Sequence, residues 1–374
     1  MNICFCTLFI PSPQIGGVER VTYNLSNYFK SIGNNVFYIT GQGEPHPGRL
    51  PDGPISAKQE FINRYIETYK IDILIDQYCQ LFITHPAIRS DVKIIKCLHC
   101  NVDEHHAFRS LLETFSLANL RNSLTNILFL LNTPRRKYKQ RQGVNYQIKG
   151  ADKLVVLSPA YKQLLVNKSK DDIGSKVAAI PNSLEQSLLD IAIPEKKKTI
   201  VWCGRLVHSP KNVLFLVRLW KKLYKKYPEW NFILVGDGID RKLVEKKIVK
   251  NRLERISITG ITDPYPYYGE AGIMVLPSFH EGFPMVLLES MSHGCVPVVF
   301  DVCPAYHDVI KSGANGYIAR DYDEREFIGA VEQLMNTDLR ALQLKAKASA
   351  QQFQMSKVGA QWLALFDELM GNKV

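Results

Sequence analysis

The stretch "GIMVLPSFHEGFPMVLLESMSHGCVPVVF", residues 272–300, contains a strand, a loop, a helix and a second strand in immediate succession. Its two ends, "GIMVLP" and "VPVVF", are continuous apolar runs, which are typical of strands buried on both faces. Between them "MVLLESMSHG" predicts a short helix, and Pro284 suits the first helical position. This β-α-β pattern indicates a parallel sheet covered by helices.

The same alternation of apolar strands and helical patterns runs through the whole chain. Before residue 190 the apolar runs are "NICFCTLFI" (2–10), "NVFYIT" (35–40), "IDILID" (71–76), "KIIKCLH" (93–99) and "KLVVLS" (153–158). After the charged stretch 193–198, a second series begins with "TIVWCG" (199–204), "NFILVG" (231–236) and "RISITG" (255–260). We therefore predict an α/β protein with two doubly wound domains, residues 1–190 and 191–355, and a last helix at 356–374 that packs on either domain.

Length and composition agree with this organisation. The chain has 374 residues, and 46% of these residues are hydrophobic. A single hydrophobic core rarely serves a chain of this length. The formal net charge of +11 indicates an anionic partner, such as phosphate, nucleic acid or an acidic membrane. No basic motif interleaved with aromatic residues supports nucleic acid. The eight cysteines are scattered, and no secretory segment precedes the short apolar start, so we expect a cytoplasmic protein with reduced thiols.

One segment is strongly basic. Residues 121–153 hold eight lysines and arginines and a single acid, Asp152. A solvated basic surface is one interpretation. The other is peripheral contact with an anionic membrane, on the inner face of the plasma membrane, where basic side chains are attracted to the lipid headgroups.

Glycines and cations follow the first strand of each predicted domain. Gly16 and Gly17 open a helix, where glycine lets backbone approach a ligand closely, although a plain tight turn would also need it. Arg205 and Lys211 follow the run 199–204. A planar guanidinium and a nearby ammonium group suit a diphosphate, and two solvated surface cations are the alternative.

Two carboxylates stand in the segment 272–300. Glu281 lies in the loop beside the helix N-terminus, and Glu289 lies more than one turn along the helix. Burying an unpaired carboxylate is costly, so each acid needs partners, and vicinal hydroxyls can supply them. The backbone amides near this helix start belong to Gly282, Phe283, Met285 and Val286, whereas Pro284 has none to donate. Free amides at a helix start favour phosphate, so the segment fits a sugar joined to a nucleotide diphosphate.

Other strand ends are less specific. In "VGDGIDR" (235–241) Arg241 stands where the third glycine of a dinucleotide fingerprint belongs, so we predict only a strand-to-helix turn near a ligand. His99 ends a predicted strand, where active-site groups gather, or it serves structure alone. Cys97 and Cys100 lack a second ligand pair, so the sequence predicts no metal and no cofactor.

These residues resemble a known family. "HEGFPMVLLE" (280–289) looks like the E-x7-E signature of retaining glycosyltransferases with the GT-B fold, in glycosyltransferase family 4. Shorter motifs occur in the family's order, namely "GGVER" (16–20), "LHCN" (98–101), "IPNS" (180–183), "GRL" (204–206), "VGDG" (235–238) and "GANGYI" (313–318). The resemblance covers essentially the whole chain. It implies two Rossmann-like domains facing across a cleft, the first on the acceptor side and the second binding the nucleotide sugar.

The resemblance also implies roles for single residues. Glu281 would bind hydroxyls of the donor sugar, Glu289 the ribose hydroxyls, and His99 the sugar near the reacting carbon. Arg205 and Lys211 would neutralise the departing diphosphate.

Nucleotide-sugar contacts would come from Gly16, Gly17, Gly204, Gly236, Ile261, Gly282, Phe283, Pro284, Met285 and Val286. Ile261 would hold the base, and the glycines and helix-end amides would approach the phosphates. The family often has glycine or serine in place of Pro284, which leaves the sugar preference open.

The expected activity is hexose transfer with retention, without a metal ion, to a glycan or lipid-linked acceptor in surface polysaccharide or lipopolysaccharide assembly. UDP-hexose is the favoured donor and GDP-mannose the next. Two alternatives keep the fold: a nucleotide-sugar epimerase or phosphorylase-like enzyme, and a non-catalytic subunit that binds a nucleotide sugar.

Overall fold

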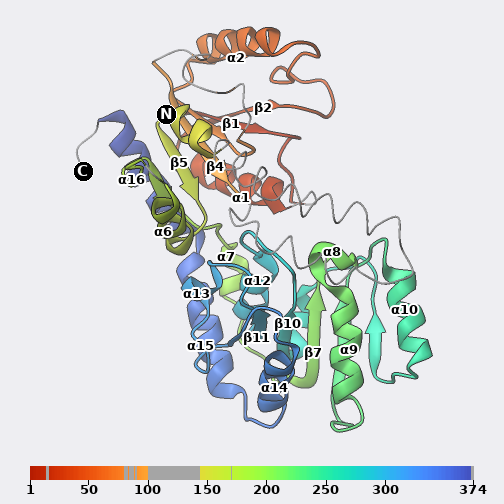
Figure 1. Cartoon of the computed structure of the whole chain (residues 1–374). Coiled ribbons are helices and arrows are strands. Elements are labelled where there is room, and N and C mark those ends of the chain that lie inside the picture. The colour runs from red at the N-terminus through yellow and green to blue at the C-terminus, as the bar shows by residue number, and fades with distance from the viewer. Residues whose placement is uncertain are drawn as a thin grey trace. The chain divides into compact units, whose positions relative to one another are not determined.

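The computed structural model describes residues 1–13, 17–79, 83, 88, 91–99, 144–169 and 171–371. They form two compact units: the first draws its described residues from 1–102, 131–183 and 355–374, and the second from 184–354. Figure 1 shows the elements of each unit. Where the structure describes the chain, it passes from one unit to the other after Ser183 and again after Gln354.

The first unit contains a parallel sheet with the strand order β2-β1-β3-β4-β5-β6. Its strands are β1 (Asn2–Thr7), β2 (Asn35–Thr40), β3 (Ile73–Asp76), β4 (Lys93–Leu98), β5 (Lys153–Val156) and β6 (Val177–Ala179). Its helices are α1 (Gly17–Ser31), α2 (Ile55–Tyr69), α6 (Pro159–Lys168) and α16 (Met355–Met370). Separate apolar clusters cover the two faces, as expected for strands that alternate with helices.

The last helix, α16, packs in the core of the first unit. Val358, Trp362 and Phe366 join the cluster formed by β1, β3 and α1. A Cβ at Gly359 would lie 2.1 Å from the ring of Tyr28 in α1, so the two helices can approach this closely only with glycine there.

The second unit contains a parallel sheet with the strand order β12-β11-β10-β7-β8-β9. Its strands are β7 (Lys197–Cys203), β8 (Asn231–Val235), β9 (Ile256–Ile258), β10 (Ala271–Leu276), β11 (Val296–Phe300) and β12 (Tyr317–Ala319). Its helices are α7 (Gln186–Leu189), α8 (His208–Lys211), α9 (Val213–Leu223), α10 (Arg241–Lys250), α11 (Tyr265–Glu270), α12 (Met285–Ser292), α13 (Tyr306–Val309), α14 (Glu324–Met335) and α15 (Arg340–Ala350), followed by a 3₁₀ turn at Gln351–Phe353.

The two sheets confirm the predicted doubly wound α/β class. In the second unit the chain order reverses between β7 and β10, where such sheets open a crevice at the carboxyl ends of the strands. The sequence analysis missed the edge strands β6 and β12, whose runs VAA and YIA contain alanine, a residue depleted in strands, whereas it found the equally short edge strand β9, which reads ISI. It also predicted Pro284 as the first residue of a helix, whereas α12 begins at Met285 and Pro284 is its N-cap residue.

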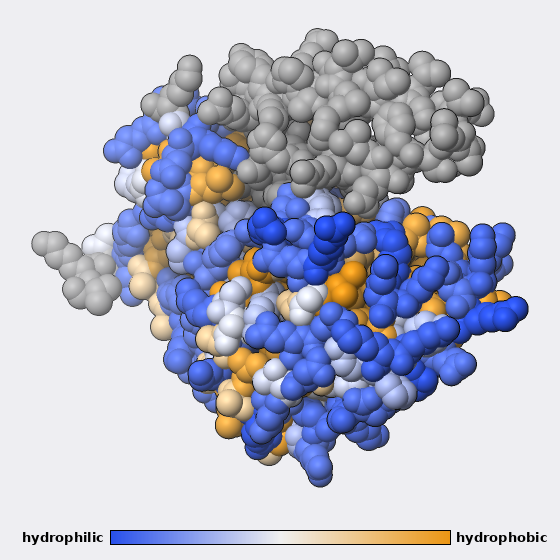
Figure 2. Space-filling view, turned by 60° about the horizontal axis from the view of Figure 1, so that its bottom comes forward, coloured by the Kyte–Doolittle hydropathy of each residue, from blue (hydrophilic) through white to orange (hydrophobic). Residues whose placement is uncertain are grey.

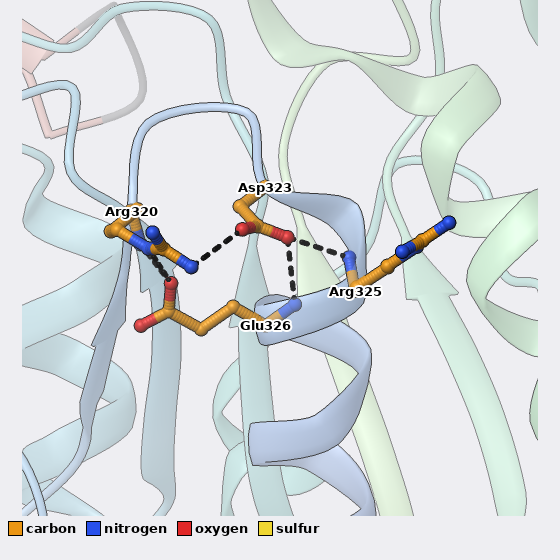
Figure 3. A network of polar contacts seen from close by, with 4 residues as sticks. All are labelled: Arg320, Asp323, Arg325 and Glu326. Carbon is orange, nitrogen blue, oxygen red and sulfur yellow. Dashed lines mark hydrogen bonds and ion pairs between the residues drawn. The ribbon is translucent and has the colours of Figure 1, made fainter.

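Hydrophilic residues dominate the described part of the face seen in Figure 2, with apolar patches between them. In one polar network, Asp323 caps α14 by accepting hydrogen bonds from the amides of Arg325 and Glu326, at 3.1 and 3.0 Å (Figure 3). Arg320 binds the carboxylates of Asp323 and Glu326. None of the helices in the described ranges is long and apolar enough to span a membrane.

Candidate active site

Loops at the carboxyl ends of β7 and β8 pack backbone against backbone in the second unit. The amide of Gly204 donates to the carbonyl oxygen of Val235 at 3.0 Å. Gly236 has a φ of +134°, and a Cβ there would lie only 1.9 Å from the carbonyl oxygen of Gly204. Only glycine fits this position, so both predicted glycines lie at the same strand-end crossing.

The loop after β7 is also tied to the loop after β10. The side chain of Asn212 donates to the carbonyl oxygen of Pro277 at 3.0 Å, and the amide of Phe279 donates to that of Pro210 at 2.8 Å. These bonds hold Lys211 and the acidic loop side by side, although some 70 residues of chain separate them.

Lys211 and Glu281 form an ion pair in this arrangement. The Nζ atom lies 2.6 Å from Glu281 Oε1, and the two side chains are 18% and 10% exposed. Ser278 Oγ donates to the same carboxylate oxygen, also at 2.6 Å. Charged hydrogen bonds in so sheltered a place fix both partners, and the sequence analysis did not anticipate Ser278.

Arg205 differs from Lys211. Its side chain is exposed on the loop after β7, and within the described ranges it makes no hydrogen bond or ion pair. The two cations therefore share a strand end, but only Lys211 contacts Glu281. The guanidinium of Arg205 has its donors available for an anion.

The helix α12 follows the acidic loop. No side chain caps its N-terminus, so the first amides, at Met285 and Val286, lack a side-chain acceptor and favour an anion. Glu289 lies further along the helix and is 3% exposed. Its charge lies near Tyr268: burial first, then the neighbouring Cys203 and Glu289, raise the pKa of that phenol.

The remaining loops of the second unit carry the strand-to-helix turn predicted near Arg241 and the residue predicted to hold the nucleotide base, Ile261. Arg241 begins α10 and pairs with Asp237 and Glu245, each at 2.8 Å, which explains an arginine in place of a third glycine. Ile261 follows Gly260 and is 90% exposed, although it is aliphatic. An apolar side chain left this open is available to a ligand.

His99 lies at the end of β4 in the first unit. Its Nε2 atom is 2.6 Å from Gln77 Oε1, and since this amide oxygen only accepts, Nε2 carries the proton. The residue is half-buried, and burial lowers the pKa of His99 to about 4. The imidazole is therefore neutral at pH 7, with Nδ1 left as an acceptor.

Gly17 begins α1 as predicted, whereas Gly16 lies outside the described residues. A contact nearby was not foreseen from the sequence. Glu19, in the first turn of α1, is 5% exposed and accepts a hydrogen bond from the hydroxyl of Tyr78. The helical spacing gave no signal for it, because a buried acid on an apolar face breaks the pattern.

Comparisons with known proteins identify the enzyme class. Residues 197–337, which contain Lys211, Glu281 and Glu289, match the family described as "Glycosyl transferases group 1". This match lies within the second unit and spans less than half of the chain. Together with the glycosyltransferase relatives described next, it identifies the chain as a glycosyltransferase, and the predicted enzyme class is confirmed.

Relatives match over most of the chain. An uncharacterized glycosyltransferase of Haemophilus influenzae is 26% identical over 379 residues, covering 93% of this chain and 95% of that protein. The amylovoran biosynthesis glycosyltransferase AmsD of Erwinia amylovora is 29% identical over 347 residues, covering 86% and 87%. Relatives of this glycosyltransferase thus include an enzyme of bacterial polysaccharide biosynthesis.

The fold agrees with a solved structure. Sucrose-phosphate synthase from Thermosynechococcus elongatus superposes with a TM-score of 0.75 at 17% identity and covers 100% of both chains. At this identity the likeness speaks for the fold alone. The chain has the GT-B fold, as predicted.

Proposed function

We propose that this glycosyltransferase moves a hexose from a nucleotide diphosphate sugar to a glycan or lipid-linked acceptor, with retention at the anomeric carbon. UDP-hexose is the favoured donor, ahead of GDP-mannose. The product would belong to a bacterial surface polysaccharide or lipopolysaccharide. AmsD, by its name an amylovoran biosynthesis enzyme, supports this acceptor class.

The Lys211–Glu281 contact beside the start of α12 is the observation that carries the proposal. Glu281 offers a carboxylate to sugar hydroxyls, and Lys211 and Ser278 both bind its Oε1 atom. Lys211 offers a positive charge at the loop that leads into α12, and the first amides of that helix, at Met285 and Val286, have no side-chain cap. A sugar and a phosphate can therefore bind next to each other.

The same groups account for the chemistry. As the bond between the anomeric carbon and the diphosphate breaks, negative charge builds on the departing oxygen. Lys211, Arg205 and the N-terminal dipole of α12 would stabilise that charge, and preplaced groups do this without reorganisation. No carboxylate needs to act as a nucleophile, because the departing phosphate can take the proton of the acceptor hydroxyl on the same face.

Other predicted residues keep their proposed roles. Glu289 would bind the ribose hydroxyls, Ile261 would hold the base, and Gly17 would approach a phosphate. His99 would accept a hydrogen bond from a sugar hydroxyl through Nδ1, since its Nε2 proton is held by Gln77. We also assign the chain to glycosyltransferase family 4 within group 1.

The donor can be identified by ligand binding. A thermal-shift panel of UDP, GDP, ADP and their sugars should raise the unfolding temperature most for UDP and a UDP-hexose, because a ligand stabilises in proportion to its occupancy. A larger shift with GDP and GDP-mannose would replace the donor. No shift with any nucleotide would overturn the proposal.

The mechanism is tested by variants and product analysis. Arg205→Ala or Lys211→Ala should lower turnover by roughly 10²-fold, whereas Lys221→Ala, which removes an exposed cation of α9, should not. Turnover is measured as nucleotide release with a lipid-linked glycan acceptor prepared from bacterial membranes. Proton NMR of the product gives the anomeric configuration. Inversion, sugar phosphate as product, or full activity in the Arg205/Lys211 double variant would each contradict the mechanism.

We further propose that the basic segment 121–153 contacts anionic membrane on its cytoplasmic face. Residues 121–143 lie outside the described part of the chain; in the rest, Lys149 is exposed and Lys153 pairs with Glu368 at 2.5 Å. Co-sedimentation with vesicles should rise with the fraction of anionic lipid. Binding that does not depend on anionic lipid would refute this contact.

A further inference from the structure

The second unit has a cavity of about 510 Å³ at the sheet edge opposite the candidate active site. Its wall includes Lys197, which begins β7, Trp230, which precedes β8, and Gly272, near the start of β10. These are the amino ends of the parallel strands. The loops that carry Lys211 and Glu281 follow the carboxyl ends, so this cavity is separate from the donor site.

Positive charge predominates in the cavity. Its lining contains four basic residues (Lys196, Lys197, Lys198 and Arg340) and two acidic ones (Glu195 and Asp338). Lys197 and Lys198 are exposed and pair with carboxylates outside it, at 2.9 and 3.4 Å. The other two cations decide what the cavity can bind.

Lys196 and Arg340 are held by backbone rather than by acids. Lys196 Nζ donates to the carbonyl oxygen of Tyr268 at 2.7 Å, and Arg340 Nη1 donates to that of Ile193 at 3.4 Å. Among the described residues neither side chain has a carboxylate partner. Burial lowers the pKa of Lys196, and the charges of Arg340 and Lys347 lower it further. An anion would relieve this repulsion.

A buried indole N–H in the cavity wall also lacks a partner. Trp230 is 3% exposed, and its Nε1 atom makes no hydrogen bond within the described ranges. Gln343 also lines the wall, and its Nε2 atom lies 4.0 Å from the position that a Cβ of Gly272 would take. Buried polar groups are normally hydrogen-bonded, so the indole N–H of Trp230 marks a place where a ligand group can bind.

Apart from Thr337, the rest of the wall is apolar, and it joins two segments of the chain. Ile193 and Pro194 belong to the strand-leading segment after α7, and Met335 and Leu339 lie at the end of α14 and just before α15. A ligand that fits both kinds of lining must have an anionic head and an apolar body.

We propose that this cavity is a second ligand site, which takes a small organic phosphate. The phosphate binds between Lys196 and Arg340, the organic body lies along Pro194 and Leu339, and the indole N–H of Trp230 donates to a phosphate oxygen or a hydroxyl. Because the ligand bridges the segment 193–198 and α15, it stabilises the second unit independently of donor binding.

Phenyl phosphate is a suitable probe, with inorganic phosphate and phenol as its two halves. The wild-type chain should bind phenyl phosphate about tenfold more tightly than inorganic phosphate, because the ring buries apolar surface, and phenol should not bind measurably. The indole N–H signal of Trp230, assigned with Trp230→Phe, should shift in two-dimensional NMR during the titration.

Charge reversal supplies the control. Arg340→Glu should weaken phenyl phosphate binding at least about tenfold, whereas Lys345→Glu makes the same charge change on an exposed residue of α15 outside the cavity. Lys211→Ala should leave the Trp230 shift intact, which separates this site from the donor site. An unmoved Trp230 signal, equal weakening by both charge reversals, or loss of the shift in Lys211→Ala would overturn the proposal.

Discussion

The Lys211–Glu281 ion pair should measurably stabilise the loops after β7 and β10. Its atoms lie 2.6 Å apart, and the side chains are 18% and 10% exposed. Exposed ion pairs couple by about 0.2–1 kcal/mol, whereas removing one partner of a fully buried pair costs about 3–5 kcal/mol. This pair is nearly buried but keeps contact with water. We expect a coupling free energy of about 2 kcal/mol between the two charges.

A double-mutant cycle with Lys211→Met, Glu281→Gln and the double variant measures this coupling. Lys211→Met should be the more destabilising change, because it leaves a sheltered carboxylate without its cation. Urea unfolding followed by tryptophan fluorescence is a suitable assay, since three of the four tryptophans, Trp202, Trp220 and Trp230, lie in the second unit.

A second pair provides the matched control. Lys198 and Glu229 lie 3.4 Å apart and are 61% and 44% exposed, so their cycle should give a coupling below about 0.5 kcal/mol. If Lys211 and Glu281 couple no more strongly than this exposed pair, the contact does not organise the site, and the role given to it here is wrong.

Three further predictions concern other parts of the fold. Gly236→Ala should destabilise the second unit by about 2 kcal/mol or more and weaken nucleotide binding, because the new Cβ would overlap the Gly204 carbonyl. Gly269 has open space around it, so Gly269→Ala should change neither stability nor nucleotide binding. Urea unfolding and ligand titration measure the two effects. His99 has a folded pKa of about 4, below its unfolded value, so it is neutral in the fold and stability falls as pH drops from about 6.5 towards 4. His99→Gln should reduce that loss in thermal unfolding measured across this pH range, and an identical pH profile would contradict the assignment. Asp323→Ala should lower the unfolding temperature at pH 7, because it uncaps α14. The backbone hydrogen bond from Glu326 lowers the pKa of Asp323, so the difference in unfolding temperature from wild type should shrink as pH falls through that pKa. A difference that does not depend on pH would argue against the cap.

Much of the architecture could be predicted because it repeats a local pattern. Continuous apolar runs alternating with helices specify parallel sheets, and every longer run became a strand. The prediction failed where the local signal is weak. Strands β6 and β12 have three residues each and contain alanine, whereas the equally short edge strand β9 reads ISI and was predicted.

The candidate site divides in the same way. The residue types at strand ends could be identified from sequence, because their chemistry and their motif are local. Their contacts could not, because these depend on strand order. Lys211 meets Glu281 because β7 pairs directly with β10, with two intervening strands placed on the other side of the sheet. Gln77, which orients His99, likewise follows the neighbouring strand β3.

Strand order also explains how one unit can hold two separate anion sites. Because β7 and β10 are neighbours in the sheet, the loops that follow them lie together at the carboxyl edge, and the segments that precede them lie together at the amino edge. Helix dipoles and backbone amides favour anions at the first edge, where α12 begins. At the second edge α15 also begins in the cavity wall, at Arg340, but Asp338 already accepts a hydrogen bond from the amide of Arg340, so an anion there must rely mainly on side-chain cations. The grouping of Lys196 and Arg340 without acidic partners is therefore the feature that distinguishes the amino-edge cavity from an ordinary surface hollow.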